Sequence, residues 1–404
     1  MGTLNDTANA DRFHIGIFGS RNVGKSSLIN AITNQDLAIV SNVKGTTTDP
    51  VSKAMEILPL GPVVIIDTPG FDDDDKLLGE KRIEKVKKVI NRVDLALLVV
   101  AFDSEVNDYD LSIEKIFIDK NIPYIIVINK SDLIDDIKTI KFINKFKNKN
   151  NIIYVSSLKK QNIDLLKELI GKFKIENSDK SIVGDIVKPN DLVILVTPID
   201  ESAPKGRLIL PQVRVIRDLL DHDAYPIVTK ETTLENVLDT IGRKPDFVIT
   251  DSQVFKTVDG IVPKDIPLTS FSILLARYKG FLKTAINGVE SVKNIKNGDT
   301  ILISEGCTHH RQCNDIGTTK IPKLLKELTN VDFKFETSSG LDFPDDLSKY
   351  KLIIHCGACM ISEREMIYRM NCANDLKVPF TNYGIFLAYA HGILKRSIAH
   401  VPID

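Results

Sequence analysis

The first part of the chain alternates short apolar runs with amphipathic stretches. From residue 13 to about residue 174 the apolar runs are rich in β-branched residues and are bounded by turn or polar residues: FHIGIFG, PVVIIDT, LALLVVAF, YIIVIN and IIYVSS. Continuous apolar runs of this length are typical of parallel strands buried on both faces. We therefore predict a doubly wound α/β sheet over residues 13–175, preceded by a flexible polar N-terminus over residues 1–12.

Two further α/β regions follow the polar segment ENSDKSIVGD, which we interpret as a linker. Residues 186–266 hold the strand candidates LVILVT, YPIVT and DFVIT, separated by the helical patterns LPQVRVIRDLLDHD and TLENVLDTIG. Residues 267–404 hold the strand candidates TILISEG, FKFET, KLIIH and VPFTNYG, and the helix candidates IPKLLKELTN, SEREMIYRMNCAND and GIFLAYAHGILKRSIAH. The pattern predicts three α/β domains.

Composition excludes several classes of protein. The 404 residues are 43% hydrophobic and 26% charged, as in globular proteins. Lys plus Arg number 53 against 54 Asp plus Glu, so no overall basic excess indicates nucleic-acid binding. No apolar run approaches a membrane span, and the N-terminus lacks a signal-peptide layout, so we expect a cytoplasmic protein. None of the five cysteines precedes Cys307, which favours a metal site over a disulfide framework.

A phosphate-binding motif follows the first predicted strand. Gly19-Ser-Arg-Asn-Val-Gly-Lys-Ser26 fits G-x-x-x-x-G-K-[ST] and leads into the helical pattern SSLINAIT. Backbone N–H groups of such a loop wrap the phosphates, Lys25 reaches the β- and γ-phosphates, and the Ser26 hydroxyl binds Mg²⁺. The predicted nucleotide contacts here are Gly19, Ser20, Arg21, Asn22, Val23, Gly24, Lys25, Ser26 and Ser27.

Two further segments fit the Mg²⁺ and γ-phosphate contacts. Asp67-Thr-Pro-Gly70 follows the strand VVII, so Asp67 would hold Mg²⁺ through water and the Gly70 N–H would sense the γ-phosphate. In Gly45-Thr-Thr-Thr48, we expect Thr47 to complete the Mg²⁺ shell. Lys25, Thr47 and Gly70 are the predicted catalytic contacts.

The base is predicted to be guanine. Asn129-Lys-Ser-Asp132 follows the strand YIIVI. The Asp132 carboxylate can accept hydrogen bonds from guanine N1–H and N2–H, which adenine does not offer, so ATP would leave a buried carboxylate unpaired. Asn129 would bridge to the phosphate loop, and the Lys130 stem would lie along the base.

Three residues refine this interpretation. Ser156-Ser157-Leu158 fits the last guanine-binding loop, with Leu158 where Lys is usual. Phe71 stands where many small GTPases place a water-orienting Gln, so another group must assist hydrolysis. Asn22 resembles the Asn that contributes to a K⁺ site in the TrmE and Era group, and this resemblance implies slow hydrolysis stimulated by K⁺. Asn22 could equally serve only to cap the loop.

A second constellation lies in the last region. Cys307-Thr-His309 follows one predicted strand, and His355-Cys356-Gly-Ala-Cys359 follows another. The carboxyl ends of parallel strands meet at one edge, so the three thiols can converge. Zn²⁺ bound by three Cys and one His, and a [4Fe-4S] cluster bound by three Cys, both fit this donor set.

The nucleotide motifs followed by C-x-H and H-C-x-x-C resemble the HydF family, the maturation GTPases of [FeFe]-hydrogenase. The resemblance extends through SAPKGRLILPQ and PLTSFSILLARYKG. It implies a GTPase domain, a dimerisation domain over residues 186–266 and a cluster domain over residues 267–404. It also implies a [4Fe-4S] cluster on Cys307, Cys356 and Cys359, with His309 or His355 as a possible fourth ligand.

The resemblance further implies a homodimeric scaffold and carrier. It would receive a diiron precursor built with radical-SAM maturases and deliver it to apo-[FeFe]-hydrogenase, with GTP turnover biasing partner association. The alternative is an Era-like RNA- or ribosome-associated GTPase with a structural zinc site. Near-neutral charge and the absence of an RNA-binding signature in the third region favour the carrier.

The K⁺ interpretation of Asn22 predicts a cation dependence. Replacing K⁺ by Na⁺ at constant ionic strength should slow GTP hydrolysis, because the cation would neutralise negative charge that develops in the transition state. Phosphate release in the two salts is the measurement. Equal rates would remove the role of Asn22 in binding a cation.

Overall fold

The computed structural model describes residues 12–33, 51–57, 60–68, 89–103, 106–133, 145–147, 151–175, 180–199, 208–306, 316–340 and 342–403. The chain divides into two compact units, Met1–Asp179 and Lys180–Asp404. Four of the predicted site residues, Thr47, Gly70, Cys307 and His309, lie outside the described residues.

The first unit contains a six-stranded sheet in the order β2-β3-β1-β4-β5-β6. All neighbouring strands are parallel except β2, which runs antiparallel to β3. The elements are β1 (Phe13–Phe18), α1 (Lys25–Thr33), β2 (Val51–Ile57), β3 (Gly61–Asp67), β4 (Leu95–Ala101), α3 (Asp108–Asp119), β5 (Tyr124–Asn129), β6 (Ile152–Tyr154) and α5 (Ile163–Ile175).

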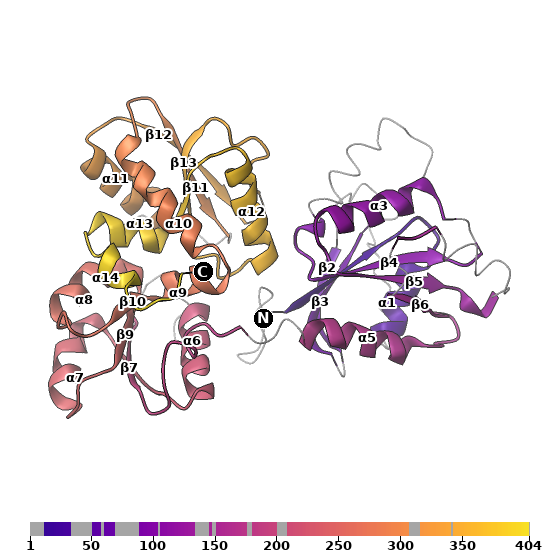
Figure 1. Cartoon of the computed structure of the whole chain (residues 1–404), viewed down its shortest axis with the longest axis horizontal. Helices are drawn as coiled ribbons and strands as arrows, with labels where there is room; N and C mark the ends of the chain where they lie inside the picture. Colours follow the sequence, from indigo (N-terminus) through magenta and orange to yellow (C-terminus); the bar gives the residue numbers. More distant parts are fainter. Residues whose placement is uncertain are drawn as a thin grey trace. The chain divides into compact units, whose positions relative to one another are not determined.

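Two hydrophobic cores cover the faces of this sheet. The side chains of β4 alternate between the cores, so Leu97 belongs to one and Leu98 to the other. One core includes α1 and α5, and the other includes α3, which lies on the opposite side of the strands in Figure 1. Burial on both faces explains why the strands are continuous apolar runs.

The second unit contains two four-stranded parallel sheets, with strand orders β10-β9-β7-β8 and β12-β11-β13-β14. The elements around the first sheet are β7 (Leu192–Val196), α6 (Leu210–Asp221), β8 (Tyr225–Thr229), α7 (Leu234–Thr240), β9 (Phe247–Thr250), α8 (Phe255–Ile261), β10 (Leu268–Ser270) and α9 (Phe271–Tyr278). Those around the second are α10 (Leu282–Val289), β11 (Thr300–Glu305), α11 (Ile321–Thr329), β12 (Lys334–Ser339), β13 (Tyr350–His355), α12 (Glu363–Asp375), β14 (Phe380–Asn382), α13 (Tyr383–Ala390) and α14 (Leu394–Ile398).

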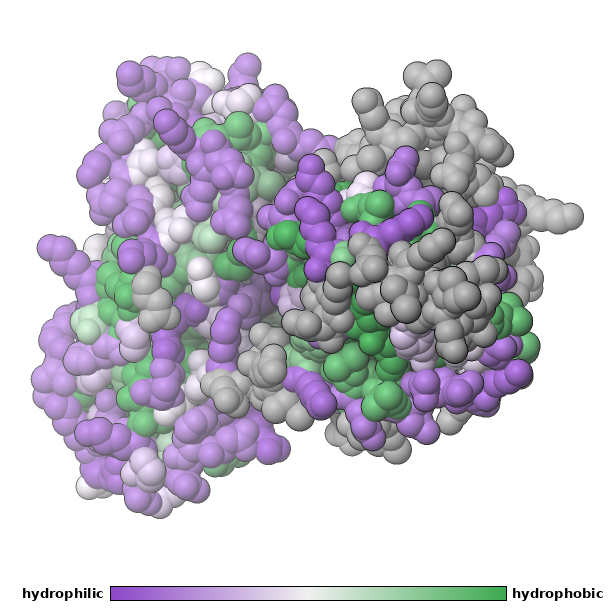
Figure 2. Space-filling view, turned by 45° about the vertical axis from the view of Figure 1, so that its right-hand side comes forward, coloured by the Kyte–Doolittle hydropathy of each residue, from purple (hydrophilic) through white to green (hydrophobic). Residues whose placement is uncertain are grey.

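Hydrophilic residues cover most of the described surface seen in Figure 2, with hydrophobic residues showing between them. Among the described residues, no helix combines the length and apolar character needed to span a bilayer.

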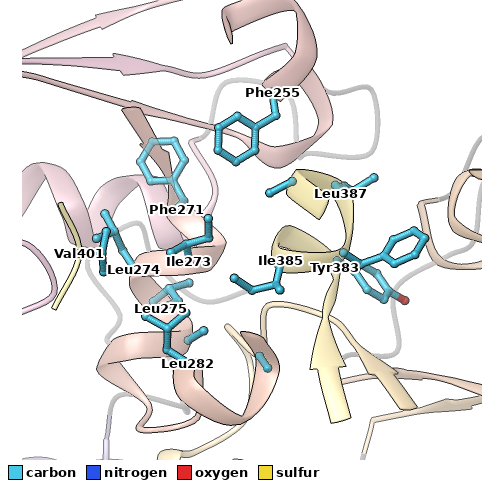
Figure 3. Close-up of a cluster of buried hydrophobic side chains, with 14 of the residues drawn as sticks. Phe255, Phe271, Ile273, Leu274, Leu275, Leu282, Tyr383, Ile385, Leu387 and Val401 are labelled. Carbon is cyan, nitrogen blue, oxygen red and sulfur yellow. The ribbon is translucent and has the colours of Figure 1, made fainter. Parts of the chain in front are cut away.

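One hydrophobic core joins the two sheets of the second unit. Figure 3 shows part of this core, where Phe271 and Ile273 of α9 and Phe255 of α8 lie near Ile385 and Leu387 of α13. Polar contacts reinforce the joint, because Arg396 of α14 donates to Asp259 Oδ1 at 2.6 Å and to the carbonyl oxygens of Val262 and Ile266. The two sheets therefore belong to one folded unit.

The predicted α/β class is confirmed, and the structure corrects several details. The sequence analysis missed the strands β2 and β10. Strand β10 is only three residues long and pairs with β9. The boundary expected between residues 266 and 267 thus separates two strands of one sheet. The predicted helix over residues 384–400 is two helices, since Gly392 adopts φ +73° and ends the first.

Packing of α10 against β14 predicts a stability effect. A Cβ on Gly288 would lie 2.0 Å from the Phe380 carbonyl oxygen. Gly288→Ala should therefore lower the free energy of unfolding of the second unit by about 1–3 kcal/mol, because helix or strand must shift. Gly260→Ala is the matched control, since its added methyl would meet no atom within 4 Å. Chemical denaturation of both variants tests this; equal destabilisation would contradict the close approach.

Candidate functional site

The phosphate loop turns through left-handed backbone between β1 and α1. Gly19 has φ +140° and Gly24 has φ +92°, and added Cβ atoms there would lie 2.1 Å from the Val99 oxygen and 2.3 Å from Asn129 Nδ2. Asn22 also has positive φ, at 64°. Asn adopts this region more readily than most residues, so the backbone gives a reason for Asn22 that is independent of K⁺.

Lys25 and Asp67 interact electrostatically at this loop, and each opposes the effect of burial on the pKa of the other. Lys25 is buried, and its Nζ donates to the carbonyl oxygens of Gly19 and Ser20 at 2.8 Å each. Burial lowers the pKa of Lys25, although Asp67 and Asp110 oppose that shift. Burial raises the pKa of Asp67, and Lys25 opposes the rise. Among the described residues, Asp67 Oδ1 is buried without a hydrogen-bond partner, as suits an oxygen that faces a metal ion or its water.

The neighbouring helix α3 fixes Ser20 of the loop. Asp110, 2% exposed, accepts a hydrogen bond from Ser20 Oγ at 3.0 Å, and Asn107 Nδ2 donates to Ser20 Oγ at 2.9 Å. Asn107 and Asp110 also form the capping box of α3. The sequence analysis missed both residues. Their N-x-x-D spacing could have revealed a helix start, but not the contact with Ser20.

Asn129 connects the phosphate loop to the last loop of the predicted guanine site. It is buried; its Nδ2 donates to the Val23 carbonyl oxygen at 3.0 Å. Its Oδ1 accepts from the backbone N–H and Oγ of Ser157 at 3.1 and 2.9 Å. The expected bridge from Asn129 to the phosphate loop is therefore present.

The other predicted guanine contacts lie beside Asn129. Ser156 Oγ donates to Asp132 Oδ1 at 2.7 Å, and this bond is the main cause that lowers the pKa of Asp132. Lys130 has φ 61° and pairs with Asp103 at 2.8 Å, a partner that the sequence did not reveal. Lys159, next to the unusual Leu158, lies 3.9 Å from Asp132. The hydrogen bond from Ser156 therefore orients the Asp132 carboxylate and favours its ionised form.

The remaining loop residues differ in exposure. Val23 is buried, whereas the side chains of Arg21, Ser26 and Ser27 are exposed. Ser26 and Ser27 lie in the first turn of α1, whose N-terminus favours bound anions.

In the second unit, the C-x-x-C loop follows β13. Cys356 and Cys359 are half-buried and packed against the hydrophobic core. Cys356 Sγ accepts from the backbone N–H groups of Gly306 at 3.1 Å and Ala358 at 3.4 Å. Burial raises the pKa of Cys356 to about 11, with Cys359 adding to the rise and those two N–H groups opposing it. Gly306 directly precedes Cys307 in the sequence.

His355 is fully buried in a polar network. Arg369 Nη1 donates to His355 Nε2 at 3.1 Å, and His355 Nδ1 donates to the Cys356 carbonyl oxygen at 2.9 Å. Burial, together with Arg369, lowers the pKa of His355 to about 3. Glu365 accepts from Arg369 Nε at 2.9 Å and balances its charge. Both nitrogens of the neutral ring are thus engaged. No cluster of three or more His, Cys, Asp or Glu side chains with metal-binding geometry occurs among the described residues.

Family models match all three regions of the chain. The hydrogen maturase F dimerization domain matches residues 182–280, and the hydrogen maturase F tetramerization domain matches residues 283–400. Together they span more than half of the chain. The chain belongs to the hydrogen maturase F family. A third model, of the 50S ribosome-binding GTPase, matches residues 14–130, which confirms the predicted GTPase domain of this hydrogen maturase F chain.

The similar curated proteins include two kinds of GTPase. The tRNA modification GTPase MnmE of Lactobacillus helveticus is 32% identical over 241 residues, covering 58% of this chain and 48% of that protein. The GTPase Era of Thermoanaerobacter sp. is 29% identical over 236 residues, covering 54% of this chain and 76% of that protein. The chain thus spans about half the length of MnmE.

Similar solved structures include Era and engB. A structure of Aquifex aeolicus Era is 19% identical with a TM-score of 0.34, covering 82% of this chain and 94% of that one. A probable GTP-binding protein engB is 25% identical with a TM-score of 0.35, covering 41% of this chain and all of that one.

The bridge formed by Asn129 predicts an effect on nucleotide affinity. Asn129→Ala removes three hydrogen bonds and leaves the buried Val23 carbonyl unpaired, so GDP binding should weaken by about 5- to 150-fold, equivalent to about 1–3 kcal/mol. Titration with a fluorescent GDP analogue is the measurement. Glu168→Ala, on the exposed face of α5, is the control. Unchanged affinity in folded Asn129→Ala would show that the bridge does not organise the site.

Proposed function

We propose that this protein is a GTP-hydrolysing scaffold that holds a [4Fe-4S] cluster and delivers a diiron precursor to apo-[FeFe]-hydrogenase. The observation that carries the proposal is the presence of two different candidate sites in one chain. One unit has an organised guanine-nucleotide site, and the other, matched by the hydrogen maturase F models, has a cysteine loop whose sulfur already accepts backbone hydrogen bonds.

The nucleotide site supports binding of GTP with Mg²⁺. The carboxylate of Asp67 at the end of β3 has a buried oxygen with no hydrogen-bond partner among the described residues, which fits a metal-bound water, and Ser26 lies in the first turn of α1. Lys25 supplies a buried cation for the phosphates. Thr47 and Gly70 are the proposed partners in hydrolysis, and K⁺ near Asn22 is the proposed accelerator.

The donor chemistry of the cysteine loop fits an iron–sulfur cluster. The N–H groups that donate to Cys356 Sγ oppose the rise of its pKa that burial causes, and the thiolate is the form that binds iron. Cys307, Cys356 and Cys359 would hold the cluster. Because both ring nitrogens of His355 are engaged, we propose His309 as the candidate fourth ligand. A cluster with three thiolate ligands offers an exchangeable iron site through which cargo can be held.

Assembly and partners complete the proposal. The dimerization and tetramerization domain matches support a homo-oligomer built on a homodimer. Radical-SAM maturases would supply the diiron unit in the cytoplasm, and the nucleotide state would bias association with the hydrogenase rather than drive chemistry at iron. Residues 182–400 match hydrogen maturase F domains rather than an RNA-binding module, which favours the carrier over the Era-like alternative with zinc.

The two sites should be separable by mutation. Lys25→Ala should abolish GTP hydrolysis and leave iron and sulfide content unchanged, because the ammonium contacts only the nucleotide site. Cys356→Ser should lower the iron and sulfide content and leave GTP hydrolysis unchanged, because an alkoxide is a poorer iron ligand than a thiolate. Phosphate release, metal and sulfide analysis, and electron paramagnetic resonance after anaerobic reconstitution provide the readouts.

Matched controls are available in each unit. Lys172→Ala changes an exposed lysine of α5, and Cys372→Ser changes a half-buried cysteine of α12 outside the motif. The two-site account would be wrong if either test variant, correctly folded, lost both activities. A colourless protein that binds only zinc would support the RNA-associated alternative.

A further inference from the structure

A buried lysine lies directly behind the cysteine loop. Lys279 follows α9 at its C-terminal cap and is 2% exposed. It lies within residues 182–280, the part of the chain that matches the dimerization domain, whereas the cysteine loop lies in the part that matches the tetramerization domain. Because isolated buried lysines are costly, such a side chain requires polar partners.

Lys279 donates hydrogen bonds to backbone atoms of the cysteine loop. Its Nζ donates to the carbonyl oxygen of Ala358, inside the C-x-x-C motif, and to that of Ile361 at 2.5 Å. These acceptors lie on either side of Cys359 in the sequence. One side chain therefore ties together both ends of the segment that carries this cysteine.

Ala358 is the residue that needs this support. It is fully buried and adopts φ 56°, a left-handed conformation that is unfavourable for a non-glycine residue. In this conformation its N–H donates to Cys356 Sγ while its carbonyl oxygen accepts from Lys279. Strained backbone persists only where the surroundings hold it, and here the strain aims an N–H at a cysteine sulfur.

We propose that Lys279 is a positioning residue for the iron–sulfur cluster, holding the loop of Cys356 and Cys359 in its binding conformation and placing a positive charge beside the cluster. This inference rests on the proposed function. Reduction adds an electron to a cluster that already has three thiolate ligands, so a nearby buried cation stabilises the reduced state more than the oxidised state. Loss of the cation makes the reduction potential more negative.

Substitutions that separate charge from side-chain bulk test the proposal. Lys279→Met removes the charge and the donors, and Lys279→Arg keeps a cation. Lys283→Met is the matched control, because Lys283 is an exposed lysine of the next helix, α10. Each full-length protein is reconstituted anaerobically with iron and sulfide. Iron content, the midpoint potential and the electron paramagnetic resonance signal of the reduced cluster are then measured.

We expect Lys279→Met to bind the cluster about 10- to 100-fold more weakly and to show a more negative midpoint potential. Lys279→Arg should restore the potential towards that of the wild type, and Lys283→Met should match the wild type. Wild-type iron content, potential and spectrum in folded Lys279→Met would overturn the inference. If Lys279→Met does not fold by circular dichroism, Lys279→Gln replaces it as a neutral donor, and an unshifted potential there overturns the role of the charge.

Failure of the proposed function gives a different result. In that case the wild type itself would hold no iron–sulfur cluster after reconstitution. A wild-type protein with a cluster, together with an unaltered Lys279→Met, contradicts only the role of Lys279.

Discussion

Parallel pairing of strands is the constraint on which the rest of this structure depends. Each parallel strand ends in a loop at the carboxyl edge of its sheet, and both candidate sites are made from such loops. In the first unit, β1 leads to the phosphate loop, β3 ends at Asp67 and β5 ends at Asn129. In the second, β11 leads to Gly306 and β13 to Cys356, and the register that pairs Ser304 with His355 brings the two loops into contact.

Buried polar side chains then give these loops their shape. Asn129 holds the phosphate loop at Val23, and Lys279 holds the cysteine loop at Ala358. In both loops a non-glycine residue has left-handed backbone, Asn22 in one and Ala358 in the other. The hydrogen bonds of the buried amide and ammonium are stronger in a low-dielectric interior than in water, and leaving their partners unpaired would be costly. Each loop is therefore held by a buried polar side chain from another part of the chain.

The second unit shows why sequence boundaries between its regions are difficult to draw. A continuous hydrophobic core joins both sheets, and Arg396 near the C-terminus donates to backbone oxygens around α8. Lys279 adds a polar link between the parts that match two different family models. Regions that match different family models are packed here as one body, because a single hydrophobic core contains residues of both sheets.

The sequence by itself determined the α/β class, most strands and the nucleotide motifs, because these depend on local periodicity and on short spacings within one loop. It also singled out Cys356 and Cys359 by the C-x-x-C pattern. Only the tertiary structure decided the partners that act across long separations, such as Asp110 on Ser20 and Arg369 on His355. Short elements such as β10 also became visible only there. The physical reason is that such partners carry no periodic or motif signal and are selected by packing, burial and charge compensation after the chain has folded.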